Sequence, residues 1–511
     1  MTLSEAEDKT ESHHHQLVLV PHFIAGEPLV SGDCYLPVED PALGHEIRKV
    51  ILADRSVSER AIMAAQDALP AWRATPPAKR AQIMFRFKQL LERDAEIICS
   101  LISEEHGKTI EDARGELKRG IENVDYACGV QELLKGEYSH DAGPGIDTWS
   151  NLQSVGVVAG ITPFNFPAMV PLWMFPMALA CGNTFILKPS EQVPSASIRM
   201  AELLHEAGLP AGVFNVLQGD REAVEVLIAA PEVKALSFVG STPVARAIYE
   251  GGTRHGKRVQ ALGGAKNHAV VMPDADIDNA VEALLGAAYG SAGERCMAIS
   301  VAVCVGDAVA DELIVRIADR ARDLRIGPGL QPGNDMGALI NRGHRERVAG
   351  YLESGVVDGA ELLVDGRDHP LGTESEGYFL GASLFDRVTP DMSIWQDEIF
   401  GPVLCVVRVE SLDAAIALID SHAYGNGTCI FTRDGAAARQ FADSIEVGMV
   451  GINVPLPVPV ASHSFGGWKS SLFGDLHAYG PDAVRFYTRR KAISQRWPGS
   501  AVVSAQFSFP S

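Results

Sequence analysis

The chain has 511 residues, and 46% of them are apolar, so there is ample material for a large core. At roughly 150 residues per domain, this length predicts about three domains. Basic side chains number 44 and acidic ones 65, and the net charge of −21 argues against nucleic acid or an anionic membrane surface as the main partner.

The cysteines and the first residues narrow the class of protein further. Eight cysteines are too few for a disulfide scaffold in so long a chain, and none forms a Cys-x-x-Cys pair, so we expect no metal site. Residues 1–16 lack a basic stretch followed by an apolar one, which argues against a signal peptide. We expect a disordered tail over residues 1–16 and a cytoplasmic protein.

The first part of the chain predicts strands followed by helices. Residues 20–60 indicate short strands and turns. Leu69–Ile102 places apolar residues at helical spacing, with Lys and Arg on the opposite face, and Lys108–Val130 repeats the pattern around Arg119. Residues 138–154 are polar, and we expect them to form an arm outside the main body together with the strand predicted over Val484–Pro498.

The segment from Val155 to Leu187 carries no charge and resembles a membrane span at first sight. Four prolines interrupt it, and each one removes a helix hydrogen bond and clashes with the preceding turn. A helix in contact with lipid would be left with unpaired backbone groups. We therefore expect buried and partly irregular backbone, which is frequently a binding site.

Strands and helices alternate through the rest of the chain. The first series has strands over 155–161, 184–187, 213–217 and 233–239, with helices over 169–179, 196–207 and 221–229. The second series begins near Ala269, with helices over 277–289, 308–323 and 413–420 and strands over 301–305 and 403–407. Strands that are apolar on both faces and alternate with helices predict parallel sheets covered by helices. The sequence thus indicates an α/β protein whose two units meet near Leu262–Ala265.

Three short segments carry residues suited to chemistry. Thr242 and Pro243 begin a helix after a strand, and such a helix N-terminus can bind phosphate, with Thr242 as the predicted N-cap. Cys296 lies in a small-residue loop beside Arg295, which favours the thiolate. Asn165 is held between prolines after a strand and can donate to an oxyanion. Taken alone, each segment also fits a purely structural role: an ordinary capped helix at Thr242, an inert loop cysteine at 296 and a turn asparagine at 165.

Taken together, five motifs resemble those of the aldehyde dehydrogenase superfamily, from about His22 to Pro498. They are Pro163–Pro167, Lys188–Glu191, Phe238–Thr242, Gly293–Cys296 and Glu398–Pro402. The resemblance implies the fold of that family, with a Rossmann-like NAD-binding domain, an α/β catalytic domain and an oligomerisation arm. The implied ranges are 17–137 and 155–262 for the NAD-binding domain, 263–483 for the catalytic domain, and 138–154 and 484–511 for the arm.

More narrowly, the chain resembles the CoA-acylating branch that acts on methylmalonate semialdehyde. The motifs that carry this resemblance are Arg119–Glu122, Gly264–His268, Gly293–Ala298, Gly451–Pro455 and the stretch from Ser464 to Pro498. The resemblance implies NAD- and CoA-dependent oxidative decarboxylation of methylmalonate or malonate semialdehyde to propanoyl-CoA or acetyl-CoA. The implied partners are a carboxylated aldehyde, CoA and further copies of the chain, with a homotetramer expected.

The resemblance also implies a role for individual residues. Cys296 would attack the aldehyde, Asn165 would hold the oxyanion, and Arg119 and Arg295 would bind the substrate carboxylate. The implied NAD-binding residues are Thr162, Phe164, Lys188, Glu191, Gln192, Ser241, Gly263, Glu398 and Phe400. Glu191 favours NAD because a carboxylate accepts bonds from ribose hydroxyls and repels a 2′-phosphate. Gln192 stands where this branch has arginine.

The most informative position is Ala261. Hydrolytic members of the family have Glu-Leu-Gly-Gly-Lys there, and the glutamate activates water. A CoA thiol with a pKa near 8.5 is already partly ionised at neutral pH, so a site without that glutamate suits thiolysis. Three alternatives remain open: Glu294 or another carboxylate as the base, a hydrolytic dehydrogenase of another carboxylated semialdehyde, and a non-catalytic NAD-binding or structural homologue.

Overall fold

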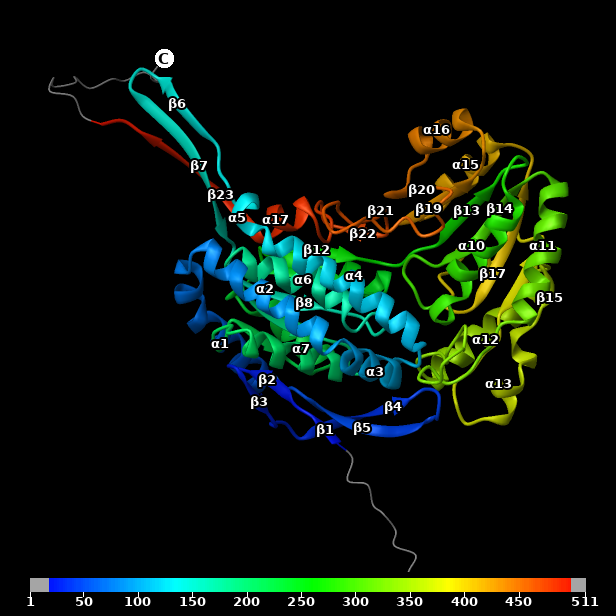
Figure 1. The fold of residues 1–511 in the computed structure, drawn as a ribbon, viewed down its shortest axis with the longest axis horizontal. Helices are drawn as coiled ribbons and strands as arrows, with labels where there is room; N and C mark the ends of the chain where they lie inside the picture. The colour runs from blue at the N-terminus through cyan, green and yellow to red at the C-terminus, as the bar shows by residue number, and fades with distance from the viewer. Residues whose placement is uncertain (1–17, 498–511) are drawn as a thin grey trace, which may run out of the picture.

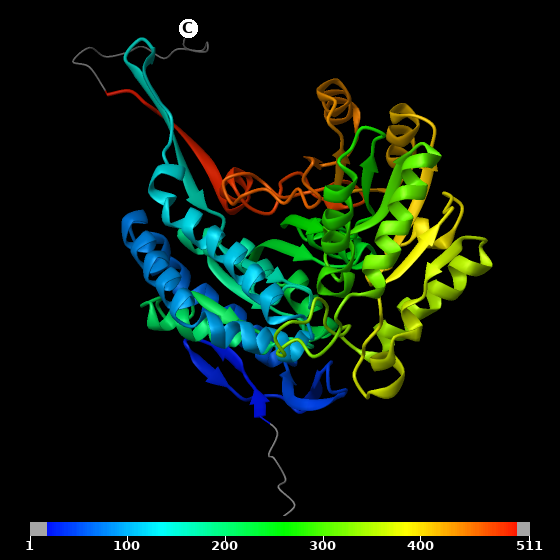
Figure 2. The same cartoon turned by 45° about the vertical axis from the view of Figure 1, so that its right-hand side comes forward.

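The computed structural model describes residues 18–497. The tail expected over 1–16 and the last part of the predicted arm, 498–511, lie outside the described residues. Two large sheets lie side by side, each covered by helices, and a narrow arm projects from the body (Figure 1). The arm stands clear of both sheets in the turned view as well (Figure 2).

The first large sheet contains the strands predicted in the middle of the chain. Its eight strands run in the order β22 (Leu472–Phe473), β12 (Arg258–Leu262), β11 (Val233–Val239), β8 (Val157–Ile161), β9 (Thr184–Lys188), β10 (Phe214–Val216), β2 (His22–Ile24) and β3 (Glu27–Leu29). The strands from β12 to β10 are parallel, and outer strands pair antiparallel. The helices predicted between them are α6 (Met169–Ala180), α7 (Ser195–Glu206) and α8 (Arg221–Ala229), and α9 (Thr242–Arg254) follows β11.

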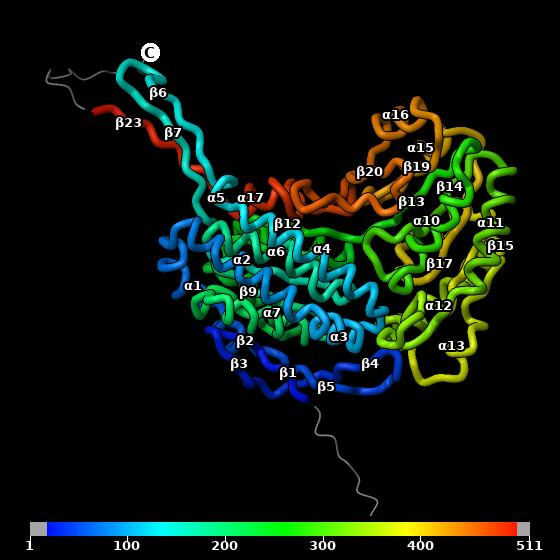
Figure 3. The backbone as a smooth tube through the Cα atoms, in the orientation of Figure 1, coloured from blue at the N-terminus to red at the C-terminus, as the bar shows by residue number. Residues whose placement is uncertain are grey.

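The N-terminal region differs from the prediction in two places. Strands β1 (Val18–Val20), β4 (Cys34–Asp40) and β5 (His45–Leu52) form a small sheet, as expected for this region, beside α3 (Ala95–His106) and α7 (Figure 3). Helix α1 (Arg55–Ala74), however, already begins at Arg55 because the Asp54 side chain caps it. The single helical stretch expected over 69–102 is divided among α1, α2 (Pro77–Arg93) and α3 (Ala95–His106). The prolines at 76 and 77 cause the first break, because proline cannot donate the backbone hydrogen bond that would continue α1.

The second large sheet is built mainly from the later strands. Its order is β15 (Glu361–Val364), β16 (Ser383–Asp386), β17 (Val403–Val409), β14 (Ile299–Val305), β13 (Asn267–Val271), β19 (Gly427–Phe431) and β20 (Met449–Ile452). Its longer helices are α10 (Ile277–Tyr289), α11 (Asp307–Arg322), α12 (Arg342–Val357), α15 (Leu412–Ser421) and α16 (Gly435–Ser444). All strands except β15 pair in parallel, as alternating strands and helices predict.

The arm joins two segments that are far apart in the sequence. Strand β7 (Ile146–Ser154) pairs antiparallel with β6 (Tyr138–Gly143) and with the whole length of β23 (Thr488–Gln495). The strand expected from Val484 is wrong over its first four residues, which belong to helix α17 (Pro481–Tyr487). Pro481 and Asp482 in the first turn favour that helix start.

The uncharged segment 155–187 is buried inside the first unit. It forms β8, a loop, the fully buried helix α6 and β9. Within residues 18–497, no helix is both long and apolar enough to cross a membrane. Helix α4 (Ile110–Cys128) packs against α6 and so lies beside the irregular loop. The remaining short elements are α5 (Val130–Leu133), η1 (Gly290–Gly293), η2 (Gly366–Asp368), α13 (Pro370–Glu374), α14 (Ser393–Gln396), β18 (Tyr424–Gly425) and β21 (Trp468–Lys469).

Candidate active site

Cys296 lies on the loop between η1 and β14, where two cavities meet. One cavity, of about 290 Å³, faces helix α4, and the other, of about 190 Å³, faces the loop after β8. The turn before Cys296 requires glycine at 293, because φ is +73° and a Cβ there would lie 2.1 Å from the Gly401 carbonyl oxygen. The Gly293–Cys296 and Glu398–Pro402 motifs are therefore in direct contact.

Two asparagines fix the backbone of Cys296, the predicted nucleophile. Asn267 and Asn426 each donate a side-chain N–H to the Cys296 carbonyl oxygen, at 2.9 and 3.0 Å. Burial and, to a smaller extent, the nearby Glu398 carboxylate raise the pKa of the Cys296 thiol to about 12, although Arg295 opposes the change. In the absence of bound ligands the thiol is thus protonated at neutral pH.

Asn165 projects from the loop between β8 and α6 into the smaller cavity that Cys296 also lines. Its side-chain amide donates one N–H to the Glu294 carbonyl oxygen at 3.0 Å and is almost fully buried. An amide carries two N–H donors, so the second remains for a ligand in the cavity. The arrangement brings Asn165 and Cys296 together, as their sequence-implied roles require.

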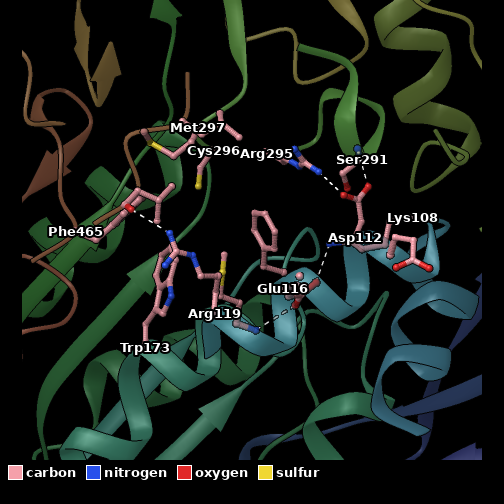
Figure 4. Close-up of a pocket in the computed structure, with 16 residues that line it drawn as sticks. Lys108, Asp112, Glu116, Arg119, Trp173, Ser291, Arg295, Cys296, Met297 and Phe465 are labelled. Atoms are coloured by element: carbon pink, nitrogen blue, oxygen red, sulfur yellow. Dashed lines mark hydrogen bonds and ion pairs between the residues drawn. The ribbon is translucent and has the colours of Figure 1, made fainter. Parts of the chain in front are cut away.

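The larger cavity holds the two arginines expected to bind a carboxylate. The Cys296 thiol points into it between Arg119 on one side and Arg295 on the other (Figure 4). Arg295 forms an ion pair with Asp112, which also accepts a hydrogen bond from the Ser291 N–H at 3.0 Å. Arg119 pairs with Glu122 at 2.8 Å, and Glu122 does not line the cavity.

Apolar side chains complete this cavity. Trp173 packs against Phe465 with ring centroids 4.6 Å apart, and both line the wall near Arg119. The other apolar lining residues are Phe166, Met169, Met297, Leu456 and Val458. The cavity is therefore suited to a small molecule with one anionic end and an apolar middle.

A groove of about 910 Å³ along the first sheet contains five of the predicted cofactor residues. They are Thr162, Phe164, Lys188, Glu191 and Ser241. Helix α9 begins at the groove with Ser241 as its N-cap, not Thr242 as predicted. The Thr242 hydroxyl instead accepts a hydrogen bond from the Gly264 N–H at 2.8 Å, so it connects the helix start to the Gly263–Gly264 turn.

This groove has features that fit a dinucleotide. The N-terminal N–H groups of α9 lack a side-chain cap and can bind a pyrophosphate. Lys188 Nζ lies 3.1 Å from Glu191 Oε2 at the groove, where both side chains can bind ribose hydroxyls. The groove shares Phe164, Gly240 and Ser241 with the smaller cavity, so a bound dinucleotide would reach Cys296.

Gly263, Glu398 and Phe400 line the smaller cavity as well. The Glu398 carboxylate accepts a hydrogen bond from the Ala265 N–H at 2.9 Å, and burial raises its pKa to about 7. A Cβ at Gly264 would lie 2.4 Å from Glu398 Oε2, so only glycine at this position leaves room for the carboxylate. Lys266, to which the Gly264–His268 motif assigns no role of its own, donates to the Ile394 and Asp397 carbonyl oxygens and holds this loop.

Gln192 lies apart from the groove lining. Its side chain accepts a hydrogen bond at 2.6 Å from Asn341, the N-cap of α12, and so joins the two units. Helix α12 also brings His344 and Arg347 to the smaller cavity, two residues that no local pattern singles out. The cofactor role of Gln192 stays a prediction.

The carboxylates near the nucleophile decide whether water can be activated. Ala261 is buried in β12 and has no carboxylate. The Glu294 side chain accepts from the Ile340 N–H at 3.1 Å and lies near His106 and His344, and it lines neither cavity. Asp112 and Glu116 are engaged in ion pairs. This geometry makes Glu294 unsuitable as the base for water at Cys296. Glu398 is the carboxylate that shares the smaller cavity with the thiol, and it is held by the Ala265 N–H and predicted to bind NAD.

Comparison with known proteins yields a match over most of the chain. The sequence model described as the aldehyde dehydrogenase family matches residues 30–493. A malonate-semialdehyde dehydrogenase of Pseudomonas aeruginosa is 67% identical over 491 residues, which are 96% of this chain and 99% of the relative. Malonate-semialdehyde dehydrogenase 1 of Geobacillus thermodenitrificans is 49% identical over 460 residues, 90% of this chain and 95% of the relative.

Two solved structures are similar to the described fold. The crystal structure of methylmalonate-semialdehyde dehydrogenase from Oceanimonas doudoroffii has a TM-score of 0.94 and 60% identity, and the match covers 95% of this chain and 99% of that one. A protein of Sinorhizobium meliloti assigned as a methylmalonate-semialdehyde dehydrogenase, crystallised with NAD, has a TM-score of 0.94, 50% identity and the same coverage.

Proposed function

The chain belongs to the aldehyde dehydrogenase family, and from that premise we propose that it oxidises malonate and methylmalonate semialdehyde with NAD and CoA. The products are acetyl-CoA or propanoyl-CoA, carbon dioxide and NADH. The names of the similar proteins support the substrate, and the NAD complex of one of them supports the cofactor. The observation that carries the proposal is the position of Cys296 between an arginine-containing cavity and the dinucleotide groove.

The chain's residues can perform the first half of the reaction. The Cys296 thiolate attacks the aldehyde carbon, and its proton is lost to solvent or a nearby base. The Asn165 amide and the Cys296 backbone N–H donate to the oxygen that becomes negative, a form of stabilisation worth roughly 10²–10³ in rate per donor. NAD, when bound, accepts a hydride from the former aldehyde carbon. The acyl group then remains on Cys296 as a thioester.

The second half depends on what attacks that thioester. The acyl group occupies the larger cavity, so the attacking group reaches Cys296 from the side of the smaller one. Ala261 supplies no base for water, and Glu294 is directed elsewhere. A CoA thiolate needs no such base, because part of the thiol ionises near neutral pH. Thiolysis therefore releases the acyl group as a CoA thioester and restores Cys296.

The substrate carboxylate is assigned to the larger cavity. Arg119 and Arg295 flank the thiol there, in a chain whose net charge of −21 would otherwise repel an anion. The β-carboxyl group leaves as carbon dioxide, with its C–C electron pair passing to the α-carbon, which then takes up a proton. The thioester carbonyl stabilises the carbanion character at that carbon, so no further catalytic residue is needed for this step.

We further propose that the enzyme works as a homotetramer in the cytoplasm. The arm strands β6 and β23 are the edges of their sheet, and an exposed edge is suited to pairing with another chain. All eight cysteines are free thiols, a state typical of a reducing compartment.

One assay tests the proposal. NADH formation from malonate semialdehyde is followed with and without CoA, and the product is identified by mass. We expect a burst of about one NADH per active site without CoA, followed by slow turnover, and steady formation of acetyl-CoA with it. Fast steady turnover to free malonate without CoA would place the chain among hydrolytic dehydrogenases, and the absence of NADH under both conditions would indicate a non-catalytic homologue.

A further inference from the structure

A buried ion pair lies behind the loop that carries Asn165. Lys108 follows helix α3, and Glu116 lies on helix α4; both side chains have zero exposure, and Lys108 Nζ lies 2.8 Å from Glu116 Oε2. Removing two charges from water is energetically costly, and an ion pair offsets that cost only with further hydrogen bonds. The partners of this pair are therefore informative.

The additional bonds of both residues go to the Asn165 loop. Lys108 Nζ donates to the Asn165 carbonyl oxygen at 2.6 Å and lies 4.4 Å from the centre of the Phe166 ring. Glu116 Oε1 accepts from the Ala168 N–H at 2.8 Å and the Met169 N–H at 3.1 Å. Helix α6 has no side-chain cap from its own N-cap residue, so Glu116 supplies this cap from another helix.

The pair thus holds the loop at both ends. Lys108 fixes the peptide of Asn165, and Glu116 fixes the first turn of α6 three residues later. On the opposite side, the Asn165 amide donates to the Glu294 carbonyl oxygen in the nucleophile loop. The direction of the remaining amide N–H therefore depends on two points, one in the ion pair and one beside Cys296.

We propose that Lys108 and Glu116 are positioning residues for the oxyanion donor: they act through Asn165 and do not bind substrate. This inference rests on the proposed role of Asn165 in the reaction. A misplacement of about 1 Å can cost roughly 10²-fold in rate, so loss of the pair should slow acylation strongly. An effect transmitted through Asn165 must disappear when the Asn165 amide is absent.

The test is a mutant cycle on the NADH burst, measured with malonate semialdehyde and with propanal. The neutral variant Lys108→Met/Glu116→Gln removes both charges together and leaves an amide oxygen for the α6 N–H groups, so that no unpaired charge is buried. We expect its burst rate to fall about ten- to a hundredfold with both aldehydes, with NAD affinity within about twofold of the parent. In an Asn165→Ala background, the same change should cost less than about threefold.

Several results would overturn the inference. A loss of the same size with and without Asn165 would show that the pair acts elsewhere. A loss confined to malonate semialdehyde would show that Lys108 binds the substrate carboxylate, because both residues also line the larger cavity. An unchanged burst in the neutral variant would leave the pair without a role in catalysis.

Controls separate this inference from folding and from the proposed function. Arg114→Gln removes the exposed ion pairs that this residue of the same helix makes with Glu96 and Glu111, and it should leave the burst unchanged. If the neutral variant no longer binds NAD or no longer shows a cooperative thermal unfolding transition, the single change Glu116→Gln replaces it in the cycle. Equal losses of burst rate in the parent and in the Asn165→Ala background would again refute the inference. A parent protein that forms no NADH would refute the proposed function instead, and an unaffected Asn165→Ala variant would refute the role of Asn165.

Discussion

Replacement of Arg119 by leucine should change the choice of substrate more than the rate of the chemistry. Three cations line the larger cavity, and two of them already have anionic partners within it: Lys108 pairs with Glu116, and Arg295 pairs with Asp112. Arg119 pairs with Glu122, which lies outside the lining and is half-exposed. Arg119 is therefore the cation best able to turn toward a substrate carboxylate.

The magnitude follows from the surroundings of Arg119. A hydrogen bond to a charged group contributes roughly 1.5–3 kcal/mol. The Arg119 side chain is 38% exposed, so screening by water favours the lower end of that range. Since about 1.4 kcal/mol corresponds to a factor of ten, we expect kcat/KM for malonate semialdehyde to fall roughly tenfold, while that for propanal changes less than about twofold.

Both aldehydes are compared in one assay of initial NADH formation with CoA present. Lys118→Leu serves as the control, because this neighbouring cation is exposed and lies outside the cavity. Arg295→Leu should behave differently from Arg119→Leu: it leaves Asp112 without its cation and disturbs the Ser291 turn, so both aldehydes should lose rate. Equal losses for the two aldehydes in Arg119→Leu would refute the assignment of the carboxylate to this residue.

The other predictions concern the thiol and the missing base. Cys296→Ala should abolish NADH formation and retain NAD binding, whereas Cys304→Ala, in the buried strand β14, should keep most of the activity. A residual rate above about one per cent in Cys296→Ala would show that Cys296 is not the nucleophile. Ala261→Glu should raise NADH turnover without CoA, and an unchanged rate in a folded variant would argue that position 261 does not face the thioester. Without NAD, alkylation of Cys296 by iodoacetamide should rise steadily from pH 6 to 10, because the thiol pKa is about 12. Glu398→Gln should speed alkylation at pH 8, because the parent carboxylate, with its pKa of about 7, is charged there and opposes formation of the Cys296 thiolate. Below pH 6 the change should have little effect. Equal alkylation rates of parent and variant at pH 8 would contradict this coupling.

Local patterns were sufficient for the elements of the two sheets. Strands such as Val233–Val239 are buried on both faces and so form continuous apolar runs, and helix α8 beside them begins at a capping residue, Asp220. Local patterns do not predict the start of α1 at Arg55, because the signal is a single capping residue, Asp54, in a region whose pattern indicates strands. The motifs that indicated Cys296 and Asn165 are likewise local, since each one is a turn with a required residue.

The residues that position the site were missed for a different reason. Lys108 contacts Asn165 across 57 residues, and Asn426 reaches the Cys296 carbonyl oxygen across 130. No window of sequence contains both partners of such a contact. A signal did exist on α4: Glu116 lies among Ala113, Leu117 and Gly120, and a carboxylate on the apolar face of a helix needs a partner.

Helix α4 connects the three parts of the site. Asp112, Glu116 and Arg119 follow one another at spacings of four and three residues, which places them along one face of the helix. Through Asp112 this face holds the loop that carries Cys296, through Glu116 it holds the loop that carries Asn165, and Arg119 faces the larger cavity. Because one helix positions all three groups, a small shift of α4 would move the Cys296 thiol, the Asn165 amide and the Arg119 side chain together. Substitutions that displace α4 should therefore reduce the rate with every aldehyde, whereas changes confined to the Arg119 side chain should alter selectivity alone.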